Sequence, residues 1–295
     1  MIRNVIFCTL IAPVFATDAV ASGLTVNVPV VGRVTGGGGV LFATAVDVTN
    51  NGNASVPVDF YFDGKDATNG QTVSIAGTIG NFGVVPRGAG AMSPLSNQHF
   101  DDFIDSLVQS GMLASSFETD GIQGSLLLVF NGYTKRGQGS ATARFYNAFG
   151  GGNVGVSLKG HEIAASEPQK LVVTVRDTTA SAATGAIYPN LFINHTGLAP
   201  DGTPATGDIG VQISAVAATT GQPVGTPITL SIASGQTATV GRVFQALGVT
   251  PSSTTTTLLV YATVTSGNAA IEGLVSQVDS ITKDGSAFEM GRADF

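Results

Sequence analysis

The sequence predicts an all-β protein built from two tandem immunoglobulin-like β-sandwich domains, each with one short amphipathic helix. Three observations lead to this fold class. Short runs of alternating apolar and polar residues recur along the chain, separated by turn residues. The 39 glycines among 295 residues suit a protein with many tight turns. The second half of the chain also repeats the order of elements found in the first half.

The repeat is clearest around two strongly apolar runs, at 125–130 and 257–261, each of which follows an amphipathic segment. These segments, at 97–112 and 236–247, are the two predicted helices. Corresponding positions in the two halves are offset by about 132 residues. That offset is far beyond the roughly 20 to 50 residues of a solenoid repeat, so it predicts tandem domains of similar fold.

The predicted domains span residues 24–164 and 166–295, preceded by an export signal at residues 1–21. The signal prediction depends on Arg3, on an apolar run at 5–15 and on an Ala-Val-Ala cleavage sequence. The apolar run is too short for a membrane-spanning helix, which needs roughly 20 residues. The alternative is a buried N-terminal strand.

The only cysteine, Cys8, lies inside the predicted signal. The mature chain would therefore form no disulfide, no thiolate metal site and no cysteine nucleophile. Domains of about 130 residues can bury an adequate core without disulfides. Because export without disulfides is more typical of bacteria than of animals, we expect a bacterial protein that is secreted, periplasmic or displayed on the cell surface.

The first predicted domain opens with a strand whose alternating valines favour one buried face and whose Pro29 favours a sheet edge. An Asn-Asn-Gly-Asn turn at 50–53 joins the next two strands in a hairpin. The predicted elements are, in order, strands at 24–31, 40–49 and 56–62, the helix at 97–112, and strands at 125–130 and 143–147.

Each predicted helix has an apolar stripe with the spacing of one helical face. In the first helix Asn97 is the expected N-cap and Gly111 the expected end, and Gly248 ends the second. We expect each helix to close the open end of its own sandwich. The stripes consist of Phe100, Phe103, Ile104, Leu107 and Val108, and of Val240, Val243, Phe244 and Leu247.

The second predicted domain starts after a short polar linker at 165–168. The segment at 196–208 contains two prolines and three glycines, so we expect a surface loop there. The predicted strands of this domain lie at 171–175, 187–194, 211–216, 227–232, 257–261 and 275–279.

This arrangement resembles a diffuse group of secreted bacterial proteins of unassigned function that are made of tandem β-sandwich domains. The resemblance covers nearly all of the mature chain, and its motifs are structural. It implies export and a sandwich fold, and it brings no catalytic residues. The second copy departs from the pattern because it lacks the glycine-rich opening turn. The matching stretches are 36–50, 84–107, 125–130 and 144–152, with 191–194 and 234–279 in the second copy.

Charged residues make up only 11% of the chain, and the formal net charge is −7. Proteins that bind nucleic acid or anionic lipid concentrate Lys and Arg on one face, so the acidic balance disfavours both partners. The apolar content of 43% excludes disorder. We expect no transmembrane segment in the mature chain, because no later stretch is long and apolar enough.

The sequence has no recognisable catalytic or cofactor motif, so we expect no catalytic residues, no cofactor and no metal. His99, His161 and His195 lack the spacing of metal ligands. The glycines at 36–39 are not followed by the helix that a phosphate site needs, so we expect a turn there.

Other polar groups allow a functional interpretation, although a structural one is favoured for each. Asp101, Asp102 and Asp105 suggest an acid cluster for glycoside hydrolysis, but a helical wheel places them in solvent, opposite the apolar stripe. The turns at 50–53 and 63–66 offer oxygen ligands as calcium sites do, but neither matches an EF-hand loop.

Sugar-binding platforms commonly use tryptophan, and this chain has none. Tyrosines could replace it, but alternation places most of them in strands, where packing is the simpler role. The tyrosines considered are Tyr133, Tyr146, Tyr188 and Tyr261.

By elimination, we expect an exported, non-enzymatic structural, surface or adhesion protein whose partners are surface or matrix molecules, including copies of itself. Two alternatives stay open. The first is an extracellular binding module for a glycan or small ligand, with its site in loops such as 196–208. The second is a secreted hydrolase whose acid pair is assembled by the fold. Its strongest candidates are His161 and Glu162, beside the domain junction, where clefts commonly form.

Overall fold

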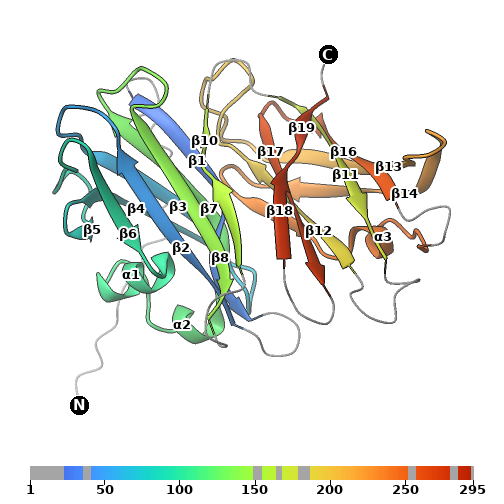
Figure 1. The fold of residues 1–295 in the computed structure, drawn as a ribbon, viewed down its shortest axis with the longest axis horizontal. Helices are drawn as coiled ribbons and strands as arrows, with labels where there is room; N and C mark the ends of the chain where they lie inside the picture. Colours follow the sequence, from blue (N-terminus) through green and yellow to red (C-terminus); the bar gives the residue numbers. More distant parts are fainter. Residues whose placement is uncertain are drawn as a thin grey trace.

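The fold is all-β, as predicted, with nineteen strands and three short helices in the ranges that a computed structural model describes (Figure 1). Those ranges are 23–35, 41–148, 155–163, 168–178, 187–251, 257–279 and 285–293. The predicted export signal, the glycine turn at 36–39 and residues 165–167 of the predicted linker lie outside them. Within the described ranges, no helix is long and apolar enough to cross a membrane. We refer to residues 23–163 as the N-terminal half and to residues 168–293 as the C-terminal half.

Two antiparallel sheets face each other in the N-terminal half. The first has the order β5-β4-β3-β7-β1, with β10 paired to β1, and the second has the order β6-β2-β8-β9. The last residues of β1, Val34 and Thr35, pair with β2 and so join the two sheets. The strands are β1 (Gly23–Thr35), β2 (Leu41–Asn50), β3 (Val58–Asp66), β4 (Thr72–Gly80), β5 (Gly83–Val85), β6 (Ser96–Phe100), β7 (Ile122–Asn131), β8 (Gly139–Asn147), β9 (Gly155–Lys159) and β10 (His161–Glu162).

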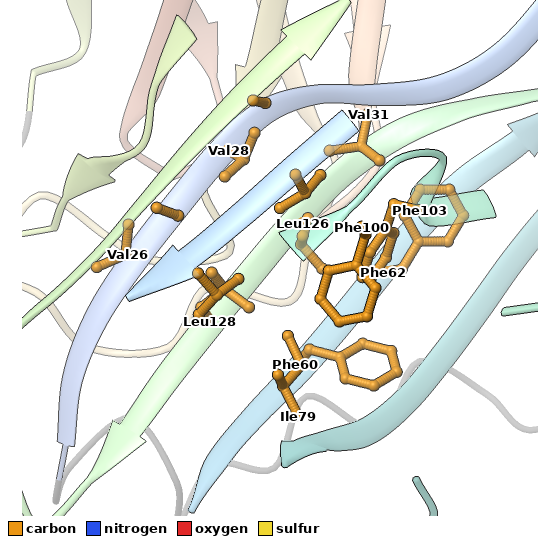
Figure 2. Close-up of a cluster of buried hydrophobic side chains, with 14 of the residues drawn as sticks. Val26, Val28, Val31, Phe60, Phe62, Ile79, Phe100, Phe103, Leu126 and Leu128 are labelled. Carbon is orange, nitrogen blue, oxygen red and sulfur yellow. The ribbon is translucent and has the colours of Figure 1, made fainter. Parts of the chain in front are cut away.

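The core between these sheets follows from alternation along each strand, because successive side chains point to opposite faces. Phe103 lies at the centre of an aromatic group, with its ring edge-to-face with Phe60 and Phe100 at centroid distances of 5.7 and 5.4 Å. Figure 2 shows the inward-facing side chains, among them Val26, Val28, Phe60, Phe62, Leu126 and Leu128.

The first helix is shorter than predicted, because its N-terminal third is a strand. Helix α1 spans Phe103–Gln109, whereas residues from Ser96 to Phe100 form β6 and pair with β2. Asp102, not Asn97, is the N-cap: its backbone is extended and its carboxylate accepts from the amides of Ile104 and Asp105. Phe100 therefore joins the apolar cluster from a strand, which the helical spacing of the stripe could not reveal.

A second helix in this half, α2 (Phe117–Asp120), was not predicted. It is a single turn with no buried residue, so it leaves no apolar stripe in the sequence. The prediction of one helix per domain is thus wrong for the N-terminal half.

The C-terminal half also consists of two antiparallel sheets, with the orders β14-β13-β16-β11-β19 and β15-β12-β17-β18. Its own apolar core fills the space between them. The strands are β11 (Lys170–Arg176), β12 (Ile187–His195), β13 (Ile209–Ala217), β14 (Pro223–Ile232), β15 (Thr237–Val240), β16 (Thr257–Ser266), β17 (Ile271–Asp279), β18 (Gly285–Glu289) and β19 (Gly291–Arg292).

The prediction of the second helix, at 236–247, is also wrong at the N-terminal end. Residues from Thr237 to Val240 form β15 against β12, and only one helical turn remains, α3 (Val243–Ala246). Gly248 follows it with a φ of +68°, a left-handed conformation that ends a helix. Val243 and Phe244 are buried in the core, as the stripe predicted.

The two halves share one strand order. The path β4-β3-β7-β1-β10 corresponds to β14-β13-β16-β11-β19, and β6-β2-β8-β9 corresponds to β15-β12-β17-β18. Among the described elements, only β5 and α2 lack a counterpart. The division into two tandem domains stays a prediction, and the residues at its boundaries, 164 and 166, lie outside the described ranges.

Candidate functional site

The two halves meet at a surface that we call the junction, formed by β1, β7, β9 and β10 on one side and by β12, β15, β17 and β18 on the other. In β1, Val26 and Val28 point into the N-terminal core, so Asn27 points out of it. In β17, Val275 joins the C-terminal core, whereas its neighbour Leu274 belongs to the N-terminal core. The outer face of one sheet therefore packs directly on the other half.

Buried polar side chains occupy the centre of the junction. Asn27 donates to Asn194 Oδ1 at 2.8 Å and also to the carboxylate of Glu272, and both asparagines are 1% exposed. The amide of Asn194 donates to the hydroxyl of Thr237 at 3.2 Å. Thr237 in turn donates to the carbonyl of Pro29 at 2.6 Å. Buried polar groups of this kind fix the relative position of two packed surfaces, because each misplacement leaves a group unsatisfied.

The structure brings His161 to this junction but separates it from its predicted partner. His161 pairs with Asn27 in the sheet, and its Nε2 lies 4.0 Å from Glu272 Oε1. Glu162 instead accepts a hydrogen bond from the backbone amide of Gly137 at 2.9 Å. The histidine therefore belongs to the polar contacts that join the halves, and the sequence could not identify Glu272 as its neighbour.

A second part of the junction covers Asp63 of β3. Asp63 lies between Ser74, which donates to its carboxylate, and Ser125, which donates to the carbonyl of Gly235 in the C-terminal half. Gln236 bonds Thr72 at 3.0 Å on the same side. Burial raises the pKa of Asp63 to about 6, with the Ser74 hydrogen bond acting in the opposite direction.

The other two histidines have separate structural partners. On β6, the half-exposed His99 lies between Asp47 and Asp101, at 2.9 and 3.0 Å, and hydrogen bonds to these carboxylates raise its pKa. His195 is fully buried: its Nδ1 accepts from the Gly197 amide and its Nε2 lies 3.0 Å from the Gly207 carbonyl. Burial lowers the pKa of His195, so the ring is neutral at physiological pH.

The three aspartates of the proposed acid cluster do not share a solvated face. Asp102 is buried as the N-cap of α1 and pairs with Arg33, contrary to the prediction that it lies in solvent. Its burial raises its pKa. Asp101 is exposed and contacts His99, while Asp105 accepts from Gln109 one turn along the helix.

The turns considered as calcium sites are organised by their own side chains. Asn50 is buried and donates to the carbonyls of Ala54 and Ser93, while its Oδ1 accepts from the Tyr133 hydroxyl at 2.8 Å. Asp66 accepts from the amide and hydroxyl of Thr68, which lowers its pKa. In the described part of the chain, no group of three or more histidine, aspartate and glutamate side chains could hold a metal ion.

The remaining tyrosines and the 196–208 loop also have internal partners. Tyr146 donates to the carbonyl of Asp101, Tyr188 lies 4.8 Å from the Arg242 guanidinium and Tyr261 lies 5.4 Å from the Lys170 ammonium. The loop folds back on itself, with Leu198 buried and paired to Pro204.

Two large apolar side chains remain exposed in the described part of the chain, Phe82 at 99% and Leu95 at 76%. Phe82 lies in the turn between β4 and β5, and Leu95 lies in the turn before β6. The two turns are bonded to each other: Ser93 donates its amide to Asn81 Oδ1, and Asn81 donates to the Ser93 hydroxyl, both at 2.8 Å. We call Phe82 and Leu95 with these two turns the apolar tip.

The apolar tip was not predicted from the sequence, although a signal for part of it was present. Phe82 stands between Asn81 and Gly83, two residue types that favour turns, so a turn on the surface could have been predicted there. The left-handed backbone of Leu95, with a φ of +51°, has no signal in the sequence.

No protein-family model matches the chain, and no curated protein matches it either. The function must therefore be inferred from the residues and their geometry.

Proposed function

We propose that this chain is an exported, non-enzymatic structural protein that adheres to a surface or matrix molecule through its apolar tip. The exposure of Phe82 and Leu95 carries the proposal. Hydrogen bonds between Asn81 and Ser93 hold the turns of these two residues together. Exposed apolar patches of proteins mark interaction sites, and aromatic residues are enriched at such sites. Export follows from the predicted signal at residues 1–21.

The tip is held in position before any partner arrives. The Leu95 amide donates a hydrogen bond to the carbonyl of Gly52 at 3.1 Å, and Asn50 Oδ1 accepts one from the Gly52 amide at 3.0 Å. Asn50 also donates to the Ser93 carbonyl. The side chain of this one buried residue therefore fixes both the Gly52 backbone and the turn that contains Leu95. A rigid presentation reduces the entropy lost on binding, which is the advantage of preorganised contact residues.

The backbone of Leu95 supports the same proposal. A non-glycine residue with a φ of +51° is strained, and a leucine side chain that is 76% exposed gains little packing in return. Arg242 has a similar φ of +47°, but its guanidinium lies over the Tyr188 ring and its amide bonds Asn190. The backbone amides of both residues are bonded within the chain, but only the Arg242 side chain packs on a neighbouring ring, so the exposed Leu95 side chain is the one that a contact outside the chain would account for.

The two alternatives gain less support from the described contacts. The 196–208 loop has its apolar residues folded inward, which disfavours it as an open ligand site. His161 and Glu272 lie among the side chains that join the halves, which favours a structural role. A hydrolase would nevertheless be recognised by turnover of an ester, glycoside and peptide panel that is lost in His161→Ala.

The adhesion proposal is tested by binding of the labelled mature protein to cells and extracellular matrix of the source organism. The Phe82→Ser/Leu95→Asn variant should lose at least about tenfold in affinity, the usual effect of removing a contact centre. Gln245→Ser, an exposed change in α3, serves as the control and should bind like the wild type. Equal binding by the wild type and the Phe82/Leu95 variant would refute the proposal.

A further inference from the structure

We propose that residues 228–232 of β14 pair with the same residues of a second copy of the chain, which gives a two-fold symmetric dimer. This surface is distinct from the apolar tip, and the inference stands whether or not the tip binds a partner. The position of β14 in its sheet, the composition of the strand and the internal repeat support the dimer.

Strand β14 is the terminal strand of its sheet and pairs only with β13 among the described residues. Natural proteins protect such edges with charged residues, prolines or very short strands. Prolines stand at 223 and 227, and the register irregularity falls in the same part of the strand. From Ile228 to Ile232 the pairing with β13 is regular, and this segment contains neither charge nor proline.

The N-terminal half shows how the corresponding edge is protected. There β4, the counterpart of β14, carries β5 on its outer side, with Thr78 opposite Val85 and Gly80 opposite Gly83. The fold therefore accepts an added antiparallel strand at this edge. In the C-terminal half, no strand of the described part of the chain takes that place.

The sequence of the segment points to a second copy as the occupant. Ile-Thr-Leu-Ser-Ile reads almost the same in both directions, so antiparallel pairing about Leu230 matches like with like. Ile228 then faces Ile232 of the other copy, and Thr229 faces Ser231. Cross-strand pairs of this kind stabilise a sheet, and a surface that meets itself in this way has the symmetry of the commonest protein dimers.

The side chains of the segment divide between the two faces of the sheet. Ile228 and Leu230 pack against the C-terminal core, while Thr229 and Ser231 are exposed. A paired second copy would therefore extend the sheet and its apolar face continuously. In Figure 1, β5 and β14 lie toward opposite ends of the molecule, so pairing through β14 leaves the region of β5 uncovered.

The test measures the mass of the mature protein by sedimentation equilibrium from about 10 µM to about 1 mM, the range of small transient interfaces. The wild type should dimerise with concentration. Thr229→Lys/Ser231→Lys places Lys opposite Lys in both pairs and should weaken the dimer at least about tenfold, because like charges across a strand pair repel. Thr174→Lys, an exposed change on β11 of the same sheet, should dimerise like the wild type.

A charge-swap experiment separates loss of pairing from loss of folding. Thr229→Glu/Ser231→Glu should also be monomeric alone, and an equimolar mixture of the Lys and Glu variants should form a heterodimer. The proposal is overturned by a wild type that stays monomeric at about 1 mM, by a dimer that the Lys variant does not weaken, or by a mixture that stays monomeric.

Discussion

Asn27 of β1 and Asn194 of β12 meet across the junction, with the Nδ2 of Asn27 2.8 Å from the Oδ1 of Asn194. The two residues are far apart in the sequence and almost completely buried. Glu272 also accepts from Asn27, and Thr237, which accepts from Asn194, donates to the carbonyl of Pro29, so these side chains connect the two halves. The relative position of the halves therefore depends on polar side chains that must all find their partners.

Replacing Asn27 with Ala should destabilise the protein by about 1 to 3 kcal/mol, because Asn194 and Glu272 lose a buried donor. Urea unfolding measures the change. Asn97→Ala is the control: the side chain of this asparagine bonds Asp47 and Thr49, but both hydrogen bonds are exposed to water, and its loss should cost less than about 0.5 kcal/mol. Similar losses for both variants would contradict the role given to the junction.

The raised pKa of Asp63 predicts an unusual dependence of folding stability on pH. Its folded pKa of about 6 lies above the ordinary value of 3.8, so the folded state binds the proton more tightly than the unfolded state. Stability should therefore fall as the pH rises from about 4 to about 6, at a total cost of about 3 kcal/mol. Asp63→Asn removes this cost, and urea unfolding should find it more stable than the wild type at pH 7.5 and nearly unchanged at pH 4. A gain of equal size at both pH values would exclude titration of Asp63 as the cause.

Phe103→Ala and Phe244→Ala should each destabilise the protein by about 3 to 5 kcal/mol, as truncation of a fully buried phenylalanine does. Both side chains are at most 1% exposed, and each belongs to a helix that closes its own core. The matched control is Phe82→Ala, the same truncation at a 99% exposed position, which should change stability by less than about 0.5 kcal/mol. Denaturant unfolding of the three variants provides the comparison, and a loss below about 1 kcal/mol at Phe103 or Phe244 would mean that the helix does not bury its stripe.

Leu95→Asn should stabilise the protein by about 1 kcal/mol while weakening adhesion. Asparagine tolerates the left-handed backbone better than leucine, and the exposed side chain contributes little to the fold. Thermal unfolding tests the first effect, and the binding assay tests the second. If the wild type is instead more stable than Leu95→Asn, the backbone strain at Leu95 does not support a contact outside the chain.

Most strands could be predicted from the sequence because apolar and polar residues alternate in a strand that buries one face and exposes the other. The predicted runs at 56–62, 125–130, 211–216 and 227–232 all lie within or overlap observed strands. The helix starts could not be predicted in the same way. Phe100 and Val240 have helical spacing to later residues, yet each lies in a strand whose partner, β2 or β12, comes from elsewhere in the chain.

The candidate sites depended on contacts that are remote in sequence. His161 could be singled out because it lies beside the predicted domain junction, but its approach to Glu272 requires the packing of β17 on β1. Asp102 looked solvated on a helical wheel because the wheel omits Arg33 and the cap. The exposed Phe82 was the part of the apolar tip that turn chemistry alone could have predicted.

The central claim, that the apolar tip is the contact point for a partner outside the chain, is tested most directly by photocrosslinking. A photoreactive phenylalanine analogue at position 82, in mature protein added to cells and matrix of the source organism, should form a specific covalent adduct. The same analogue at position 245 of α3 should not. Equal labelling from both positions, or adducts from position 245 alone, would contradict the account.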